Sequence, residues 1–207
     1  MSKVVIQGNA NGTGNFTIAA PNSNTDRTFN LPDAAGTVLT TGNQSDFPAG
    51  SVLQVLQTVK TDTFSIAGTT PTTITGLTVD ITPASTSSKF LILSDVTLGT
   101  SGFDVHLILK RNSTSLYIAD TSGTYRPEVT KSSAWYSGAE DAFASGGVPV
   151  MYLDSPSTTS QITYGFTLNH YTANGTAYVN RTHRDTDNSG NYDVRTASSI
   201  TVMEIAG

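Results

Sequence analysis

Alternation of apolar and polar residues is the feature that most constrains how this chain folds. From residue 53 onward, apolar side chains recur at every second position in one segment after another. Successive side chains of a β-strand point to opposite faces, so each such segment predicts a strand with one buried face. The sets expected to face the core are Leu53, Val55 and Val59; Leu77, Val79 and Ile81; Phe90, Ile92, Val96 and Leu98; Phe103, Val105, Leu107 and Leu109, with Asp104, His106 and Lys110 pointing outward; Ile162, Tyr164, Phe166 and Leu168; and a last strand at 200–205.

The polar residues of the chain are those of a sheet surface. Its 207 residues include 34 threonines and 23 serines, whereas charged residues make up only 13%. Threonine is β-branched and suits a pleated, half-buried surface, while helices draw their polar residues from Glu, Lys and Gln. Turn-forming Gly, Ser, Pro and Asn separate the alternating segments. The sequence therefore predicts an all-β fold, with a jelly-roll-like β-sandwich head at residues 48–207.

Residues 1–47 differ in texture from the rest of the chain. They are rich in Asn, Gly, Thr and Ala, and they hold only short apolar pieces bounded by turn formers. Such a segment has too little apolar mass for a core of its own. We expect an extended β-arm that gains order by packing on partner chains; the alternative is a disordered tail. The docking candidates in the arm are Phe16, Ile18, Phe29, Leu31 and Val38.

Charge and cysteine content exclude several classes of function. The formal net charge is −5, without a basic cluster, so we expect no nucleic-acid partner. The longest aliphatic run, residues 90–93, is far too short for a membrane span, so no membrane insertion is expected. The chain has no cysteine, which excludes disulfides and thiol catalysis. Its first residues lack the apolar stretch of a signal peptide, so synthesis in the cytoplasm is expected.

One long excursion interrupts the strand pattern between Thr121 and Gly147. Loops of this length are uncommon and are often functional. Tyr and Trp supply rigid, amphipathic contact area, which suits recognition, but they equally suit the end of a sandwich or a subunit interface. The receptor-binding candidates in this excursion are Tyr125, Trp135, Tyr136 and Phe143.

A second polar stretch, residues 180–195, contains part of a calcium-binding pattern. Asp185 and Asp187 lie at alternate positions, as in the first half of an EF-hand loop. The twelfth position is Thr196, where that loop needs a bidentate Glu, so a β-connection with local side-chain hydrogen bonds is the preferred interpretation. No cofactor is expected; the alternative is a calcium site at Asp185, Asp187 and Asp193. The spacing of Ser, His and carboxylates gives no catalytic motif, so no enzymatic activity is expected.

Several segments are similar to a known family of virion proteins. The arm contains Gly12–Ile18 and Asn24–Val38, and the head adds Pro48–Val55, Tyr152–Pro156, Tyr178–Arg181, Asp185–Asn188 and Ser199–Glu204. Together they resemble tail-fibre-like structural proteins of phages that infect cyanobacteria and other aquatic bacteria. The resemblance spans nearly the whole chain and implies a homotrimer on the virion with a β-sandwich head and no catalytic residues. In contrast to a long fibre, the chain has a single copy of the arm segment and no shaft repeats.

This resemblance leaves more than one role open. The first is a short tail-fibre-type protein for host attachment, whose arm docks on tail or baseplate proteins and whose head contacts a host surface glycan. The alternative is a capsid decoration, or cement, protein whose arm clamps neighbouring copies of the major capsid protein. A second alternative, a carbohydrate-binding lectin-like module, rests on fold class alone. The first two place the protein on a virion assembled in the host cytoplasm.

Overall fold

The computed structural model describes residues 47–120, 122–135, 143–190 and 192–207, together with scattered residues between 8 and 35; the side chains of Ala134 and Trp135 are outside this description. The chain divides into two units, residues 1–38 and residues 39–207. The described residues of the first unit are exposed and make short turns, one of them closed by a hydrogen bond from Thr25 N to Ser23 Oγ at 3.2 Å. The second unit holds all the strands named below.

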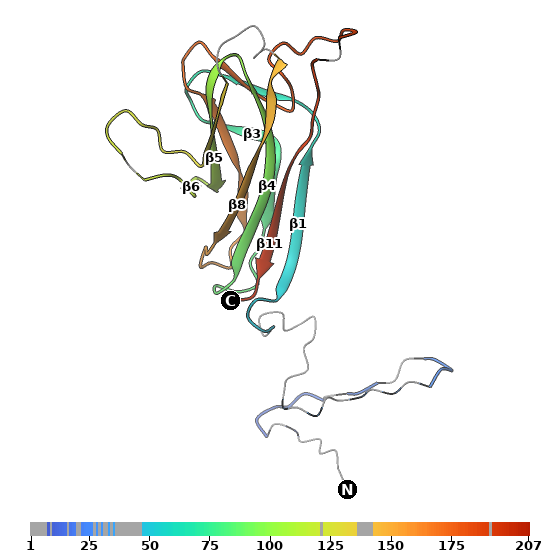
Figure 1. The fold of residues 1–207 in the computed structure, drawn as a ribbon. Helices are drawn as coiled ribbons and strands as arrows, with labels where there is room; N and C mark the ends of the chain where they lie inside the picture. Colours follow the sequence, from blue (N-terminus) through green and yellow to red (C-terminus); the bar gives the residue numbers. More distant parts are fainter. Residues whose placement is uncertain are drawn as a thin grey trace. The chain divides into compact units, whose positions relative to one another are not determined.

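The second unit is an all-β sandwich of two antiparallel sheets (Figure 1). Sheet A contains β1 (Val52–Lys60), β11 (Ser198–Ile205), β4 (Lys89–Thr100), β10 (Thr176–Val179) and β2 (Phe64–Ala67) in this order, with β8 (Ser145–Asp154) on the other side of β4. Sheet B contains β3 (Thr72–Ile81), β9 (Ile162–His170), β5 (Phe103–Arg111) and β6 (Thr114–Leu116), and β7 (Lys131–Trp135) also pairs with β5. No residue of the described part is α-helical.

The core lies between the sheets and is built by the alternation seen in the sequence. Three of the predicted walls are confirmed in full: those of β3, β4 and β9 are buried at every predicted position. In β5 the prediction holds for Val105, Leu107 and Leu109, which are fully buried. Asp104, His106 and Lys110 lie on the outer face of sheet B. Each buried aliphatic or aromatic side chain contributes roughly 1.5–3 kcal/mol to folding, so these walls account for most of the stability.

The prediction for the first strand is wrong. Val55 and Val59 in β1 are 51% and 55% exposed, because they lie on the outer face of sheet A. Leu56, which pairs with the buried Val202 of β11, is on the inward face but is itself 38% exposed. Alternation shows which residues share a face, and β1 carries apolar residues on both faces. The inward position expected for Phe103 is also wrong, since its side chain is 48% exposed.

The excursion expected between residues 121 and 147 is only in part a loop. Its middle contains β7, which pairs with β5 from Phe103↔Trp135 to Leu107↔Lys131. The segment Lys-Ser-Ser-Ala-Trp of β7 has no apolar alternation, so periodicity gives no indication of it. β2, β6, β8 and β10 were also not predicted as strands.

A polar tie joins the two sheets at one end of the core. The hydroxyl of Tyr164 in β9 donates to Asp154 Oδ2 in β8 at 2.7 Å. Arg111 in β5 donates from Nη1 to both oxygens of Asp154, at 2.8 and 2.7 Å. Burial raises the pKa of Tyr164 well above its usual value, and the carboxylate of Asp154 adds to the shift. Tyr164 is therefore a neutral donor, and the charge of the buried carboxylate is balanced by Arg111.

A second polar cluster, the Asn180 hub, closes sheet A where β10 ends. Asn180 is completely buried, and its Nδ2 donates to the carbonyls of Lys60 at 2.8 Å and Asp62 at 3.0 Å. Its Oδ1 accepts from Ser198 Oγ at 2.6 Å, and its backbone N–H donates to Thr97 O at 3.0 Å. The side chain of Asn180 thus joins the end of β1 to the start of β11, and its backbone N–H joins the end of β10 to β4. Its φ of 61° lies in the left-handed region, which Asn tolerates better than most residues.

Replacing Asn180 with Ala should destabilise the head by about 3 kcal/mol, because buried carbonyls and a hydroxyl lose their partners. Urea unfolding at constant m-value measures this. Asn112→Ala is a matched control, since Asn112 also has a left-handed φ, of 51°, but is exposed, and its Oδ1 accepts a single exposed hydrogen bond from Thr163 N. It should cost about 1 kcal/mol. Equal losses at both positions would mean that the buried bonds of the Asn180 hub add nothing beyond the backbone effect and one exposed hydrogen bond.

Candidate functional site

A projecting loop, residues 117–130, frames the candidate site. It leaves the end of β6, extends away from sheet B and returns as β7 (Figure 1, yellow-green). Its base is fixed by Thr130, whose hydroxyl donates to Leu116 O at 2.9 Å and accepts from Leu109 N at 2.8 Å. Ala119 N also donates to Val129 O across the base at 3.3 Å. The loop is therefore anchored at both ends on the rigid sheet while its tip stands clear.

A cleft of about 490 Å³ lies between the tip of this loop and the outer face of sheet B. Such a volume is within the usual range for ligand sites. The cleft combines aromatic rings with amide, carboxylate, imidazole and guanidinium groups. Its lining residues are Thr69, Asp104, His106, Thr124, Tyr125, Arg126, Pro127, Asn169 and Tyr171.

Pairing of β5 with β9 builds the polar floor of the cleft. His106 and Asn169 are cross-strand partners, and Asn169 Nδ2 lies 3.4 Å from His106 Nδ1. The same Nδ2 donates to His170 O at 3.0 Å, which fixes the amide. Tyr171 N donates to Asp104 O at 3.1 Å and thereby places the Tyr171 ring at the wall. All these groups are carried by paired strands or their ends, so the floor is preorganised.

The floor histidine is neutral at neutral pH. Partial burial lowers the pKa of His106 below its usual value, and the nearby Asp104 carboxylate only partly opposes this. Neutral imidazole has one donor and one acceptor nitrogen. The floor therefore offers an imidazole, an amide and a carboxylate that together both donate and accept hydrogen bonds.

Tyr171 of the cleft and Phe103 beside it form an aromatic wall that contains a strained residue. Phe103 and Tyr171 meet edge to face, with ring centroids 5.6 Å apart, and both are nearly half exposed. The φ of Phe103 is 62°, a conformation that bulky residues avoid and that costs about 1 kcal/mol or more. Strain of this kind concentrates at functional sites. Beneath this wall, the buried His170 donates from Nε2 to Gly102 O at 2.6 Å and accepts Thr172 N–H at Nδ1 at 3.0 Å, which fixes the backbone on both sides.

The four aromatic candidates from the sequence do not share one site. Tyr125 lines the cleft and is 96% exposed. Trp135 ends β7 opposite Phe103, but its side chain is outside the description, and Tyr136 lies outside the described residues. Phe143 packs elsewhere, with its ring 5.6 Å from that of Tyr192. The sequence reasoning missed Asn169 and Tyr171, which reach the cleft only through the pairing of β5 with β9.

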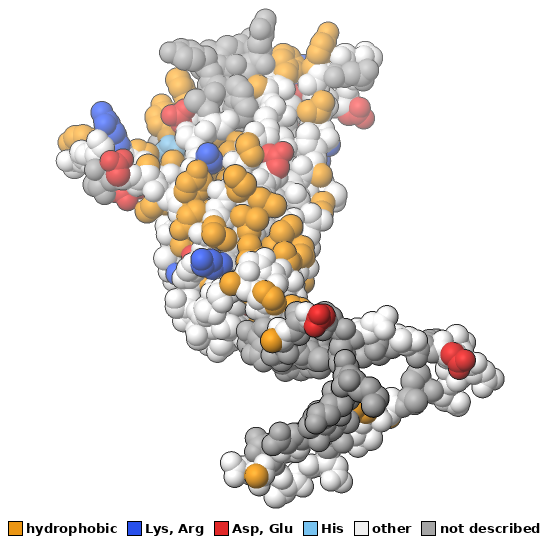
Figure 2. All heavy atoms as spheres, turned by 60° about the horizontal axis from the view of Figure 1, so that its bottom comes forward, with side chains coloured by type: hydrophobic (Ala, Val, Ile, Leu, Met, Phe, Trp, Pro, Cys, Tyr) orange, Lys and Arg blue, Asp and Glu red, His pale blue; other side chains and the backbone are white. Residues whose placement is uncertain are grey.

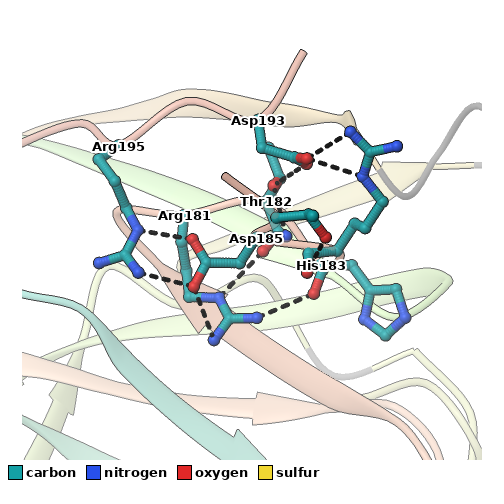
Figure 3. A network of polar contacts seen from close by, with 8 residues as sticks. Arg181, Thr182, His183, Asp185, Asp193 and Arg195 are labelled. Carbon is teal, nitrogen blue, oxygen red and sulfur yellow. Dashed lines mark hydrogen bonds and ion pairs between the residues drawn. The ribbon is translucent and has the colours of Figure 1, made fainter. Parts of the chain in front are cut away.

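The calcium candidates lie in a network of ion pairs on the 181–195 loop (Figure 3). Asp185 accepts two hydrogen bonds from Arg195, at 2.5 and 2.7 Å, and a third contact from Arg181 at 3.3 Å. Asp193 accepts hydrogen bonds from Arg184 Nε at 2.7 Å and from Thr182 Oγ1 at 2.8 Å, and its Oδ2 also forms an ion pair with Arg184 Nη2 at 2.5 Å. The bond from Arg184 lowers the pKa of the Asp193 carboxyl, which therefore stays ionised.

These ion pairs occupy most of the carboxylate oxygens that a cation could bind in the 181–195 loop. Asp185, Asp187 and Asp193 do line a hollow of about 300 Å³. Two of the three carboxylates are already neutralised by arginines, and no cluster of three or more metal-ligating side chains occurs in the part of the chain that is described. The arrangement is that of a locked surface loop.

Of the docking candidates in the arm, only Ile18 is among the described residues. Ile18 is 75% exposed, whereas Phe16, Phe29, Leu31 and Val38 lie outside the described residues. Among the described residues, no helix is both long and apolar enough to cross a membrane.

Comparison with models of known protein families and with curated proteins gave no match to this chain. Functional inference therefore rests on the cleft and on the sequence segments of arm and head.

Backbone strain at Phe103 is testable with two substitutions that both remove the ring. Phe103→Asn should be more stable than Phe103→Ala by about 1 kcal/mol, because Asn tolerates the left-handed conformation. Chemical unfolding of both variants gives the difference. The same pair at Thr73, an exposed strand position of sheet B, should show no preference for Asn. If Ala and Asn are equivalent at 103, the position is not held in this conformation.

The ion-pair network makes a prediction for proteolysis, because three arginines of the 181–195 loop are trypsin sites. Asp185→Ala should accelerate tryptic cleavage after Arg181 and Arg195 about tenfold, since local opening becomes easier. Cleavage after Arg111, at the turn between β5 and β6, is the internal control and should not change. Adding Ca²⁺ should leave the wild-type rate unaltered. Slower cleavage in Ca²⁺ would instead favour the calcium alternative.

Proposed function

We propose that this chain is a non-enzymatic virion surface protein of a bacteriophage, of the short tail-fibre type, whose head binds a host surface glycan in the cleft below the 117–130 loop. The observation that carries the proposal is the composition of that cleft. Exposed aromatic rings stand beside a floor of polar groups that both donate and accept hydrogen bonds. The resemblance of the arm and head segments to phage tail-fibre-like proteins supplies the virion context.

The chemistry of the cleft matches a sugar better than other ligands. A pyranose ring has apolar C–H faces that stack on rings such as those of Tyr125 and Tyr171, and hydroxyls that each donate and accept. Asp104, Asn169 and neutral His106 are suited to those hydroxyls. The cleft is open toward solvent, as recognition of a long surface polymer requires. Binding sites on loops held by a rigid scaffold are a common arrangement.

A binding role is favoured over glycoside cleavage. Hydrolysis by the common mechanisms requires two carboxyl groups on opposite sides of the scissile bond. Among the residues that line the cleft, Asp104 supplies one carboxylate and no second carboxylate is present. The other charged lining residue, Arg126, is on the loop and donates to Ser122 Oγ at 2.9 Å.

Removing one aromatic wall should weaken glycan binding without unfolding the head. Tyr171→Ala is expected to reduce affinity for the isolated surface polysaccharide of the host about tenfold, and Tyr125→Ala by a similar factor, because each loses a stacking contact. Isothermal titration with purified polysaccharide measures this. Tyr192→Ala is the matched control, since Tyr192 is 63% exposed but packs on Phe143. Wild-type affinity in both cleft variants would rule out the cleft as the receptor site.

Position on the particle separates the two virion roles. Gold-labelled antibody against the head should mark the tail of intact particles if the protein is a fibre. Label over the whole capsid would replace this proposal with the decoration role, in which the arm clamps the major capsid protein. No label on the particle would rule out both virion roles and leave the lectin-like alternative.

A further inference from the structure

The outer face of sheet A is strongly apolar, which is unusual for an antiparallel sheet that faces water. Such a sheet normally has one buried face and one polar face. Here Met151, Val52, Val55 and Leu153 are 69%, 55%, 51% and 49% exposed. Figure 2 shows hydrophobic side chains gathered on this face.

The register of the strands makes these side chains contiguous. Leu153 of β8 lies opposite Leu91 of β4, Leu91 opposite Met203 of β11, and Met203 opposite Val55 of β1. This row crosses four strands without a charge. A second row begins with Met151 opposite Leu93 and continues to the uncharged polar residues Thr201 of β11 and Gln57 of β1. We call this surface the apolar face of sheet A.

Charged residues are confined to the borders of the apolar face. On β4, Lys89 and Asp95 lie at opposite ends, and Leu91 and Leu93 lie between them. Both charged residues are exposed. A charge-free centre with a polar rim is the composition of a permanent interface between identical subunits.

We propose that the apolar face of sheet A is buried against a second copy of this chain. From the exposed fractions, its apolar area is on the order of 600 Å², at the upper end of the roughly 300–600 Å² that the largest patch of a typical monomer covers. It approaches the ~800 Å² per partner of a stable interface. Association of identical chains is also the commonest way in which soluble proteins cover such a face.

The position of the apolar face agrees with the site on the other sheet. The cleft lies on the outer face of sheet B, on β5 and β9, whereas the apolar face belongs to β1, β4, β8 and β11. The two outer faces of a sandwich point in opposite directions. A copy seated on sheet A therefore leaves every cleft open, but the proposal does not depend on glycan binding.

A charge placed in the apolar face should break the assembly. Light scattering of the purified full chain is expected to give a mass of two or more 21.7 kDa copies. Met151→Glu and Val55→Glu, on different strands, should each weaken association about 100-fold or more, since a buried unpaired charge is costly. Thr73→Glu on the outer face of sheet B is the control and should assemble like wild type. Circular dichroism verifies that each variant is folded.

A thiol probe tests the apolar face even if the arm also holds chains together. Because the chain has no cysteine, Met151→Cys introduces a single thiol. Its reaction with a maleimide should be at least tenfold slower in the assembled protein than in protein diluted to monomer, while Thr73→Cys should react equally in both. A wild-type monomer at about 50 µM, or equal reactivity of Met151→Cys in both states, would overturn the proposal. Such a result would assign the face to a different protein.

Discussion

The Asn180 hub is the interaction on which the arrangement of sheet A depends. A buried amide whose two N–H groups and oxygen all form hydrogen bonds is held rigidly, and the bonds of Asn180 reach the end of β1, the connection that follows it, the start of β11 and the backbone of β4. The hub fixes the point at which β10 leaves the sheet, and the 181–195 loop begins at the next residue. The ion pairs of that loop are then formed between residues whose backbone is already placed. A polar core contact thus determines both a sheet corner and the surface loop that follows it.

The two outer faces of the sandwich differ in polarity: that of sheet B carries a polar cleft, and that of sheet A is largely apolar. Sheet B presents the half-buried Asp104 and His106, with the buried Asn169 beside them, while sheet A presents a row of apolar side chains from Leu153 to Val55. Burying an apolar face contributes free energy in proportion to its area, whereas a polar floor contributes orientation and specificity. One face is therefore suited to permanent association and the other to reversible recognition.

Local periodicity gave the fold class and most of the core, and its failures have physical causes. Leu77, Phe90 and Phe166 lie in strands with one apolar and one polar face, so alternation identifies the buried side. In β1 both faces carry apolar residues, because Leu56 is on the inward face and Val55 is on the apolar face of sheet A. The nine residues of β1 contain no local signal that distinguishes its inward face from its outward face. The cleft could not be predicted for a different reason. Alternation correctly predicts that His106 points outward, but Asn169, which lies 63 residues later in the sequence, reaches it only through the pairing of β5 with β9.

Phe103 is an independent indication that the surface beside the cleft has a role other than stability. A residue chosen only for stability would be one that accepts a left-handed backbone, and Asn at 112 and 180 shows this choice elsewhere in the same head, where Tyr117, with a φ of 51°, is a second aromatic residue in this conformation. At 103 the chain instead has a large aromatic side chain, half exposed and in contact with Tyr171. The strain and the exposed apolar area both oppose folding in the free protein. A bound ligand that stacks on this wall would bury the exposed aromatic area and so offset the free energy lost by exposing it. The unfavourable φ of Phe103 is what places the ring where such a ligand could contact it.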